Sequence, residues 1–339
     1  MKILVTGGTG YIGSHTVVEL QQEGFDVVIV DNLSNSKEDV IYGIERITGI
    51  RPVLEVFDLC DITPTRQLFE KYPDISAVVH FAAYKSVGES VKEPLRYYHN
   101  NILSSINLLK GMMDAGVDHL VFSSSCTVYG QPDKLPVTEE APLKRPESPY
   151  GNTKKVMEDI ISDTAGSSGL RAILLRYFNP IGAHETAEIG ESPTGIPDNL
   201  VPYITQTAIG KRDHLRVFGD DYDTPDGTPI RDYIHVVDLA KAHVVALKRL
   251  VDEKNKKDCE VFNLGTGRGY SVLEAIKAFE KVSGVKLNYK IVDRRPGDIV
   301  KVWADTGLAN SELGWNTEKG LEDMMRTAWN WELKLAGKL

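Results

Sequence analysis

Tyr150 and Lys154 have the types and the spacing of an acid/base pair. Residues four positions apart on a helix lie on the same face, so we expect the Lys154 ammonium close to the Tyr150 phenol. A free phenol has a pKa of about 10 and is a poor base at neutral pH. A neighbouring cation favours the phenolate, so Lys154 is expected to lower the pKa of Tyr150. The pair alone is more typical of an ordinary solvated helix face than of an active site.

The residues directly before this pair predict the start of a helix. Ser148 is a favourable N-cap, and Pro149 suits the first helical turn, where its missing N–H would have no helical partner anyway. We therefore predict a helix that begins at Ser148 and Pro149, runs to about residue 164, and carries Tyr150 in its first turn.

A cluster of serines follows a predicted strand. The apolar run 119–122 indicates a β-strand, and Ser123, Ser124 and Ser125 come directly after it. Ligands of parallel sheets bind beyond the carboxyl ends of the strands, which would bring these hydroxyls to a site. Serines are also common in turns, so the cluster alone leaves both interpretations open.

A glycine-rich turn between a strand and a helix lies at the start of the chain. The run 2–6 is apolar and β-branched, Gly7, Gly10 and Gly13 follow with the spacing G-x-x-G-x-x-G, and 14–22 has a helical pattern. Such glycines let the backbone approach a pyrophosphate, whose charge is held by the N-terminus of the helix. The pattern predicts dinucleotide binding.

An acidic residue follows the second strand, predicted at 26–30, about 20 residues after the glycine turn. The carboxylate of Asp31 would accept hydrogen bonds from the ribose hydroxyls of an adenosine. It would repel a 2′-phosphate, so NAD is favoured over NADP as the cofactor.

Strand and helix patterns go on alternating, with strands at 53–57 and 77–81 and a helix at 64–71 between them. Repeated strand-helix units predict an α/β fold with a Rossmann-type, doubly wound parallel sheet and helices on both faces. The carboxyl ends of these strands place Asp58 and Phe81 where ligands gather.

The composition changes after residue 180. The stretch 182–232 is rich in Gly, Pro, Asp and Thr, whereas a strand pattern returns at 260–264. We therefore predict a smaller, interleaved C-terminal α/β domain for the substrate. The expected division is an NAD-binding domain of residues 1–180, with a return segment at about 233–266, and a substrate domain of residues 181–232 and 267–339.

The composition excludes several classes of protein. The 339 residues contain 39 Lys and Arg against 48 Asp and Glu, and a net charge of −9 argues against a nucleic-acid surface. No apolar run reaches the ~18 residues of a membrane span and the first residues lack a signal-peptide pattern, so we expect a cytoplasmic protein without membrane contact. Three isolated cysteines and eight histidines without zinc-site spacing predict reduced thiols and no metal.

Longer strings of the sequence resemble the UDP-glucose 4-epimerases, a family of extended short-chain dehydrogenases/reductases. The resemblance runs from Met1 to beyond Trp315. It rests on the strings Thr6 to His15, Asp31 to Leu33, Val87 to Ser90, Ser123 to Ser125, Arg176 to Pro180 and Arg231 to His235.

The resemblance implies a tightly bound NAD that stays in place through turnover. By position, the cofactor contacts would be Gly7, Gly10, Tyr11, Ile12, Gly13, Asp31, Asn32, Asp58, Leu59, Phe81, Ala82, Lys85, Asn100, Ser123, Lys154 and Tyr177. The UDP part of the substrate would be held by Asn179, Asn199, Leu200, Phe218, Arg231, Arg295 and Asp298, with the arginines on the diphosphate.

The same resemblance implies the reaction. Tyr150 would take the proton of the sugar's 4-hydroxyl while hydride leaves carbon 4, and Ser125 would hydrogen-bond that hydroxyl. The resulting 4-ketose would turn over, take the hydride back on its other face, and so interchange UDP-glucose and UDP-galactose. Lys154 would keep the phenol ready for both directions. A homodimer through the helices near 94–115 and 150–164 is also implied.

Val302 departs from the family pattern, because members restricted to glucose and galactose carry a bulky Tyr directly before the Trp-Ala-Asp string. A smaller side chain would leave room for an N-acetyl group at sugar carbon 2. We therefore expect some activity on UDP-N-acetylglucosamine and UDP-N-acetylgalactosamine.

Two alternatives compete with this interpretation. A nucleotide-sugar 4,6-dehydratase usually carries an Asp-Glu pair before Val-Tyr-Gly, where this chain has Cys126 and Thr127. A sensor of NAD or nucleotide sugars without catalysis would have no need to keep Ser125, Tyr150 and Lys154 together. Both alternatives are therefore disfavoured.

Overall fold

The structure is a computed structural model that describes residues 1–193, 195, 197–294 and 299–339. Contacts divide the chain into two compact units. The first unit comprises Met1–Gly130, Pro142–Tyr177 and Ala240–Phe262, and the second comprises Gln131–Ala141, Phe178–Leu239 and Asn263–Leu339.

The first unit is built on a seven-stranded sheet of the Rossmann type. Its strand order is β11-β6-β5-β4-β1-β2-β3, and the pairs from β6 to β3 are parallel. The strands are β1 (Lys2–Thr6), β2 (Asp26–Asp31), β3 (Val53–Val56), β4 (Ile75–His80), β5 (His119–Ser123), β6 (Arg171–Tyr177) and β11 (Cys259–Leu264). The predicted doubly wound α/β fold is confirmed.

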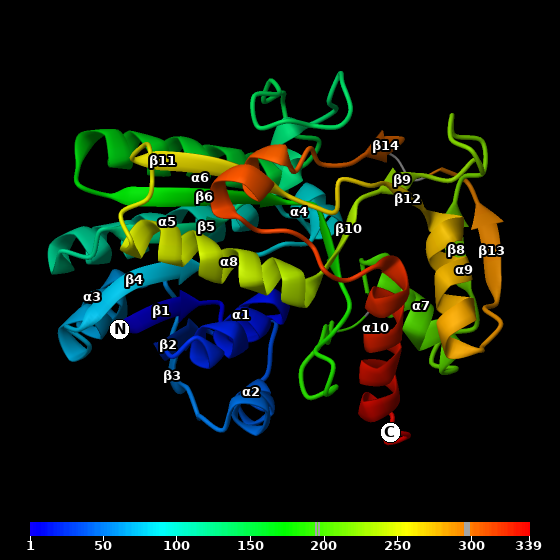
Figure 1. Ribbon diagram of the computed structural model, residues 1–339, viewed down its shortest axis with the longest axis horizontal. Coiled ribbons are helices and arrows are strands. Elements are labelled where there is room, and N and C mark those ends of the chain that lie inside the picture. Colours follow the sequence, from blue (N-terminus) through cyan, green and yellow to red (C-terminus); the bar gives the residue numbers. More distant parts are fainter. Residues whose placement is uncertain (194, 196, 295–298) are drawn as a thin grey trace. The chain divides into compact units, whose positions relative to one another are not determined.

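Helices cover both faces of this sheet, as Figure 1 shows. Strand side chains alternate between faces. Leu4, Val78 and Leu174 therefore pack with α3, α5 and α6, while Val5, Val79 and Ile173 point to the face covered by α1 and α8. The helices are α1 (Tyr11–Gln22), α2 (Val40–Thr48), α3 (Ile62–Lys71), α4 (Val87–Lys92), α5 (Pro94–Ala115), η1 (Cys126–Tyr129), α6 (Pro149–Ser167) and α8 (Val236–Val251).

In its described residues, the second unit has three small sheets and its own core. Strands β7 (Asn179–Ile181) and β10 (Tyr233–His235) form one pair, β8 (Leu215–Phe218) and β13 (Tyr289–Val292) another, and β9 (Ile230–Arg231) pairs with both β12 (Tyr270–Ser271) and β14 (Lys301–Val302). Side chains of α7 (Leu200–Ala208), α9 (Val272–Ser283) and α10 (Leu321–Leu335) fill the core; the π-helical turn η2 spans Ala309–Leu313.

The unit bounds differ from the division expected from the sequence in two ways: the return segment is shorter, at Ala240–Phe262, and one further segment lies in the other unit. Residues 131–141 belong to the second unit, although the sequence assigned them to the first domain. The reason is a long-range backbone pairing: Val137 donates its N–H to the Trp303 carbonyl at 2.9 Å and accepts from Asp305 N–H at 2.7 Å.

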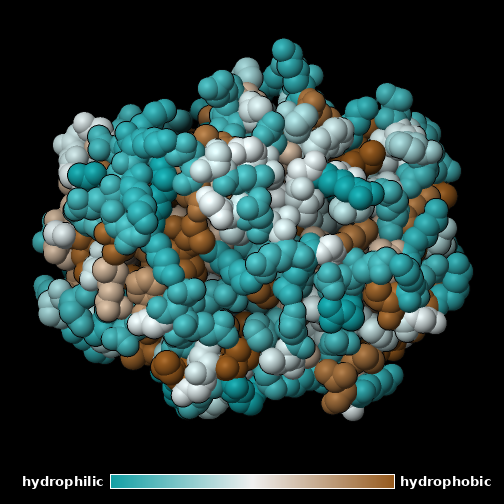
Figure 2. Space-filling model, viewed as in Figure 1, coloured by the Kyte–Doolittle hydropathy of each residue, from teal (hydrophilic) through white to brown (hydrophobic). Residues whose placement is uncertain are grey.

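The surface seen in Figure 2 is mostly hydrophilic, with hydrophobic residues in small groups. Among the described residues, none of the helices combines the length and the apolar character needed to cross a membrane.

Two buried histidines should make the fold sensitive to mild acid. Burial lowers the pKa of His80, which lies between Thr6 and Ser105, to about 3, with a further contribution from the Lys154 charge. Burial also lowers the pKa of His235 to about 3. An unfolded histidine has a pKa of about 6.5, so below that pH the unfolded chain binds protons that the folded chain excludes. The free energy of unfolding therefore decreases as the pH is lowered.

We expect each of these histidines to remove about 1.4 kcal/mol from the free energy of unfolding per pH unit as the pH drops below about 6.5. Urea unfolding between pH 6.5 and 5 measures this slope above the range in which most carboxyls titrate. His80→Gln should reduce the slope by one histidine's share, and an unchanged slope in that variant would contradict the assignment.

Candidate active site

Helix α6 places Tyr150 and Lys154 as the sequence predicts. The Ser148 side chain caps the helix by accepting from Gly151 N–H at 3.1 Å, and Pro149 is the first helical residue. Tyr150 therefore lies in the first turn, and Lys154 follows one turn later on the same side.

The Lys154 ammonium is buried beneath the end of strand β5. Lys154 is only 4% exposed, and its Nζ donates to the Ser123 carbonyl at 2.6 Å. Nζ also lies 4.8 Å from the centre of the Phe122 ring. Burial lowers the pKa of Lys154 to about 7, while the Glu158 carboxylate acts in the opposite direction. The lysine therefore titrates close to neutral pH.

The Tyr150 phenol has an environment of the opposite kind to the one expected. Burial raises its pKa, the nearby Tyr177 phenol adds to this effect, and a side-chain hydrogen bond with Ser125 lowers it. The spacing of the two residues predicts a pKa lowered by Lys154. The chain's own residues give a raised one, because the loss of solvent outweighs the neighbouring polar groups and the ammonium bonds to the Ser123 carbonyl.

Ser123, Ser124 and Ser125, called the serine segment below, are all buried, and each hydroxyl has a different partner. The Ser123 hydroxyl bonds to the Tyr177 hydroxyl, whose pKa burial raises to about 12. Ser125 Oγ accepts from the backbone N–H and the hydroxyl of Thr127, at 3.2 and 3.0 Å. The segment thus brings polar groups together at the carboxyl end of β5, as its position predicts.

The glycine turn between β1 and α1 is shaped for close backbone approach. Gly7 has φ +69°, and a side chain there would meet Ala82 N at 2.8 Å. A Cβ on Gly13 would lie 2.2 Å from the Gly7 carbonyl oxygen, so only glycine fits. Gly10 is the N-cap of α1 and supplies no side chain to its first N–H groups. Such a helix N-terminus fits a pyrophosphate.

Two carboxylates stand at the ends of the neighbouring strands β2 and β3. Asp31 accepts from Thr9 N–H at 3.2 Å and from Leu33 N–H at 2.9 Å, which ties it to the glycine turn. Asn32 donates to Asp58 at 3.0 Å. Burial opposes ionisation of Asp58, but hydrogen bonds from Cys60 and Asn32 outweigh it and lower its pKa. The acids are therefore placed to accept hydrogen bonds from ribose hydroxyls, which fits a dinucleotide.

The other predicted cofactor residues occupy the same end of the first unit's sheet or the helices beside it. Leu59 is buried after β3, and Phe81 and Ala82 follow β4. Lys85 has its ammonium 6.0 Å from the centre of the Tyr11 ring, and Asn100 on α5 donates to Asn101 at 3.0 Å. Ile12 lies in the first turn of α1.

The predicted substrate residues belong to the second unit. Arg231 and Val302 are register partners on β9 and β14, and Asn179 N–H donates to the Asp232 carbonyl at 3.0 Å, so these three lie in one neighbourhood. Asn199, the N-cap of α7, donates to Glu191 at 2.6 Å. Leu200 begins α7 and Phe218 ends β8. Arg295 and Asp298 lie outside the described residues.

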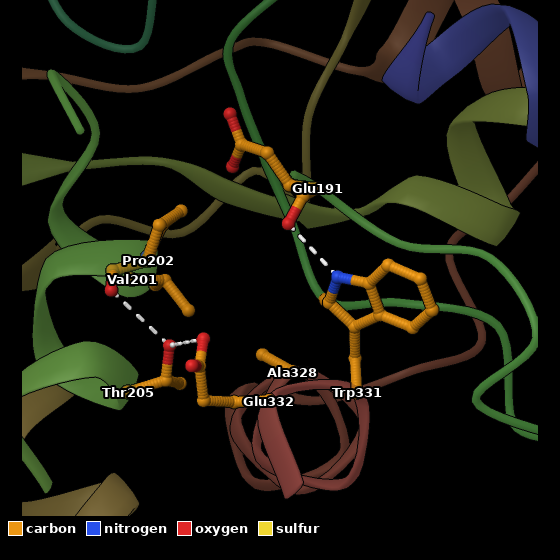
Figure 3. A pocket seen from close by; sticks show the side chains of 8 residues that line it. Glu191, Val201, Pro202, Thr205, Ala328, Trp331 and Glu332 are labelled. Carbon is orange, nitrogen blue, oxygen red and sulfur yellow. Dashed lines mark hydrogen bonds between the residues drawn. The ribbon is translucent and has the colours of Figure 1, made fainter. Parts of the chain in front are cut away.

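A small cavity in the second unit lies between α7 and α10 (Figure 3). Its volume of about 10 Å³ is room for a single water and far too small for a nucleotide sugar. Trp331 donates to the Glu191 carbonyl at 2.9 Å, and Glu332 faces Thr205 at 3.3 Å. The cavity is therefore a packing feature of this unit.

The sequence did not predict the pairing of two buried charged groups beside the serine segment. Glu158 and Arg176 form an ion pair with Nη2 and Oε2 2.6 Å apart, and the Ser124 hydroxyl bonds to Glu158. One signal pointed to Glu158: it follows Lys154 by four residues and so continues the face of the helix that carries the lysine.

Comparisons with known proteins identify the family of the chain. The family model described as the NAD dependent epimerase/dehydratase family matches residues 3–265. A UDP-glucose 4-epimerase of Bacillus subtilis (strain 168) is 50% identical over 333 residues, which are 98% of this chain and 97% of the relative.

Solved structures extend the similarity to the whole fold. UDP-glucose-4-epimerase from Stenotrophomonas maltophila, with bound NAD and formylated UDP-arabinopyranose, is 52% identical, has a TM-score of 0.96, and matches over 100% of both chains. UDP-glucose 4-epimerase from Bifidobacterium longum, in complex with NAD+ and UDP, is 46% identical, with a TM-score of 0.95 and 100% coverage of both. On this evidence the chain belongs to the NAD dependent epimerase/dehydratase family.

Proposed function

We propose that this protein is an isomerase, an NAD-dependent UDP-glucose 4-epimerase, that reversibly interconverts UDP-glucose and UDP-galactose in galactose metabolism through a transient 4-ketose. One observation carries the proposal. In a chain that is half identical to named UDP-glucose 4-epimerases along nearly its full length, Tyr150 bonds to Ser125 one helical turn from the buried Lys154.

The chain's own residues would move the proton. The Tyr150 phenolate takes the proton of the sugar's 4-hydroxyl, and the Ser125 hydroxyl, which bonds to the phenol, orients that hydroxyl. NAD, held by the glycine turn, would supply a reversible acceptor for the hydride of sugar carbon 4 and a positive charge of its own. Tyr150 gives its proton back when the hydride returns to the opposite face, so no net oxidation occurs.

Lys154 would set the charge of the site. Its ammonium is fixed by the Ser123 carbonyl. We propose that, once NAD is bound, this cation one helical turn from Tyr150 favours the phenolate against the effect of burial. Because the pKa of Lys154 is about 7, the lysine is neutral in some protein molecules at physiological pH and charged in the others. A phenol balanced in this way can act as base in one half-reaction and as acid in the other.

The cofactor and the substrate would be held by different sets of residues. We assign NAD to the glycine turn, with Asp31 on the ribose, and the diphosphate of UDP to Arg231 and Arg295. Asn179, Asn199, Leu200, Phe218 and Asp298 complete the proposed UDP site. A firm grip on the nucleotide leaves the sugar free to turn over between the two hydride transfers.

The test of the proposed reaction is direct. Purified protein incubated with UDP-galactose, with no added reductant, should produce UDP-glucose until the two sugars reach equilibrium. A 4,6-dehydratase would instead release a 4-keto-6-deoxy sugar nucleotide. A protein that binds UDP-galactose and leaves it unchanged would defeat the proposal in favour of a sensor.

Val302 should widen the range of sugars. It is buried beside Arg231 in the β9–β14 pair, so a larger side chain there would change the volume next to a proposed diphosphate ligand. We expect the protein to convert UDP-N-acetylglucosamine, and we expect Val302→Tyr to lower that kcat/KM by about 10-fold to 100-fold while UDP-galactose turnover stays within about threefold. If the protein does not convert UDP-N-acetylglucosamine at saturating concentration, the expected activity on N-acetylated sugars is contradicted.

We also propose that the enzyme works in the cytoplasm as a homodimer. Helices α5 and α6 pack side by side, and α5 exposes Leu95 and Met113, of which Leu95 is 82% accessible. Exposed apolar side chains on such a face favour a second copy as the partner. Analytical ultracentrifugation should give twice the chain mass of 37.6 kDa, and a monomer at micromolar concentration would contradict this state.

A further inference from the structure

A buried ion pair lies directly behind the serine segment. Glu158 on α6 is 3% exposed and Arg176 on β6 is 5% exposed. The guanidinium holds both carboxylate oxygens, from Nε at 2.9 and 3.2 Å and from Nη2 at 2.6 Å. Burial works against the charge of Arg176, but its bonds to Glu158 outweigh this and raise its pKa. Arg176 therefore keeps its charge beside Glu158.

The ion pair is bonded to the segment that carries the reacting groups. Glu158 accepts from the Ser124 hydroxyl, and Arg176 donates from Nη1 to the Tyr129 hydroxyl at 3.0 Å. Ser124 is the middle residue of the serine segment. Its two neighbours contact the acid/base pair: the Ser123 carbonyl holds Lys154, and the Ser125 hydroxyl bonds to Tyr150. The Glu158 carboxylate thus holds the middle residue of the serine segment, while the first and third residues contact Lys154 and Tyr150.

Stability is a weak explanation for such a pair. Removing two charges from water is expensive, and hydrophobic residues of similar volume often serve a core equally well. The first unit also contains a second buried pair of the same type, Arg249 and Glu260, with Nε and Oε2 2.7 Å apart. That pair joins α8 to β11, whereas Glu158 and Arg176 join α6 to β6 and Glu158 also bonds to the serine segment. Both pairs are buried and both join an arginine to the two oxygens of a glutamate, but their neighbourhoods differ.

We propose that Glu158, paired with Arg176, is a positioning residue of the reaction, which holds the serine segment against helix α6 and keeps the Lys154 side chain charged. The inference rests on the proposed epimerase function and extends it to a residue that touches neither sugar nor cofactor in the proposed site.

The direction of the electrostatic effect follows from the groups around Lys154. Glu158 and Tyr150 lie on its own helix, and His80 faces it from β4. On β6, Tyr177 bonds to the Ser123 hydroxyl and Arg176 pairs with Glu158. Tyr177, whose pKa is about 12, and His80, whose pKa is about 3, are neutral at pH 7. The Glu158 carboxylate is the group that raises the pKa of Lys154. Its removal should make the lysine lose its proton at lower pH.

Glu158→Gln and Glu260→Gln, compared in the full-length protein, test the proposal. Each substitution keeps the shape and removes one carboxylate from a buried arginine, so both should lower the melting temperature. Glu158→Gln alone should lower kcat by about 10-fold to 100-fold with KM for UDP-galactose within about threefold, because a small displacement of aligned groups acts on the chemical step. The alkaline limb of its kcat profile should move to lower pH.

A second readout requires no turnover. The titration of Lys154 can be followed by NMR of the protein labelled with carbon-13 lysine, the signal being identified by its loss in Lys154→Met. We expect the midpoint to fall by about one pH unit in Glu158→Gln and to stay in place in Glu260→Gln. Equal behaviour of the two variants in kcat and in the lysine titration would overturn the proposal.

Two further outcomes are separable. If the unmodified protein does not epimerise UDP-galactose, the proposed function fails, and the lysine titration still decides whether Glu158 controls the charge of Lys154. If Glu158→Gln does not fold, Ser124→Ala leaves the ion pair intact and removes only its bond to the serine segment. That variant should lose about 10-fold in kcat with an unchanged lysine titration, and parental kcat in it would refute the positioning role.

Discussion

Replacing Tyr150 by phenylalanine is expected to lower kcat for UDP-galactose by about 1,000-fold, since general acid/base groups contribute on the order of 10² to 10⁴. The substitution removes the single hydroxyl that would exchange a proton with the sugar and leaves the ring, the helix and the neighbouring Ser125 in place. A loss of this size corresponds to about 4 kcal/mol in the transition state. KM should change little, because the nucleotide provides most of the proposed binding.

Tyr42→Phe is the matched control for this prediction. Tyr42 lies on α2, its ring packs under the Arg51 guanidinium, and 43% of the residue is exposed. The same loss of one phenolic oxygen there should leave kcat unchanged. Parental activity in Tyr150→Phe would show that another group moves the proton, with Ser125 the first to test.

The second large effect is expected at Gly13, where alanine should weaken NAD binding by about 10-fold to 100-fold. The added Cβ would lie 2.2 Å from the Gly7 carbonyl oxygen and 2.9 Å from the Gly8 Cα. Both are backbone atoms of the glycine turn, so the turn itself has to open, and strain of about 1–3 kcal/mol falls on the segment proposed to hold the pyrophosphate. Absorbance of the nucleotide released from purified, denatured protein measures the retained cofactor.

Gly166→Ala serves as the control for that experiment. A Cβ at Gly166 meets nothing within 4 Å, and the residue lies inside helix α6, where alanine is favoured over glycine by about 1 kcal/mol. It should keep its NAD and be slightly more stable. Full retention of NAD by Gly13→Ala would mean that the cofactor does not depend on the shape of this turn.

The first half of the fold was predictable because each of its units is local. Strands β1 and β2 and the glycine turn between α1 and β1 occupy the predicted places, and α5 has the predicted bounds Pro94–Ala115. In a parallel α/β sheet the ends of such strands fall at one edge, so Asp31 and the serine segment could be brought to that edge from the sequence alone.

Tertiary effects limited the rest. The pairing of Val137 with Trp303 joins residues far apart in the chain, and no local sequence pattern predicts it. The direction of the Tyr150 pKa was predicted wrongly because spacing gives the nearest charge but says nothing of how much water the fold removes. The ion pair of Glu158 and Arg176 was missed for a similar reason, since a buried pair between a helix and a strand looks in the sequence like two ordinary surface charges.

The central claim is that the hydrogen on sugar carbon 4 leaves as hydride and returns to the same molecule. UDP-galactose carrying deuterium at carbon 4, incubated with the purified protein in ordinary water, tests it most directly. We predict UDP-glucose with the deuterium retained at carbon 4, measured by mass spectrometry and proton NMR. Loss of the label to solvent would contradict the account, because it would show that carbon 4 is epimerised by proton abstraction instead.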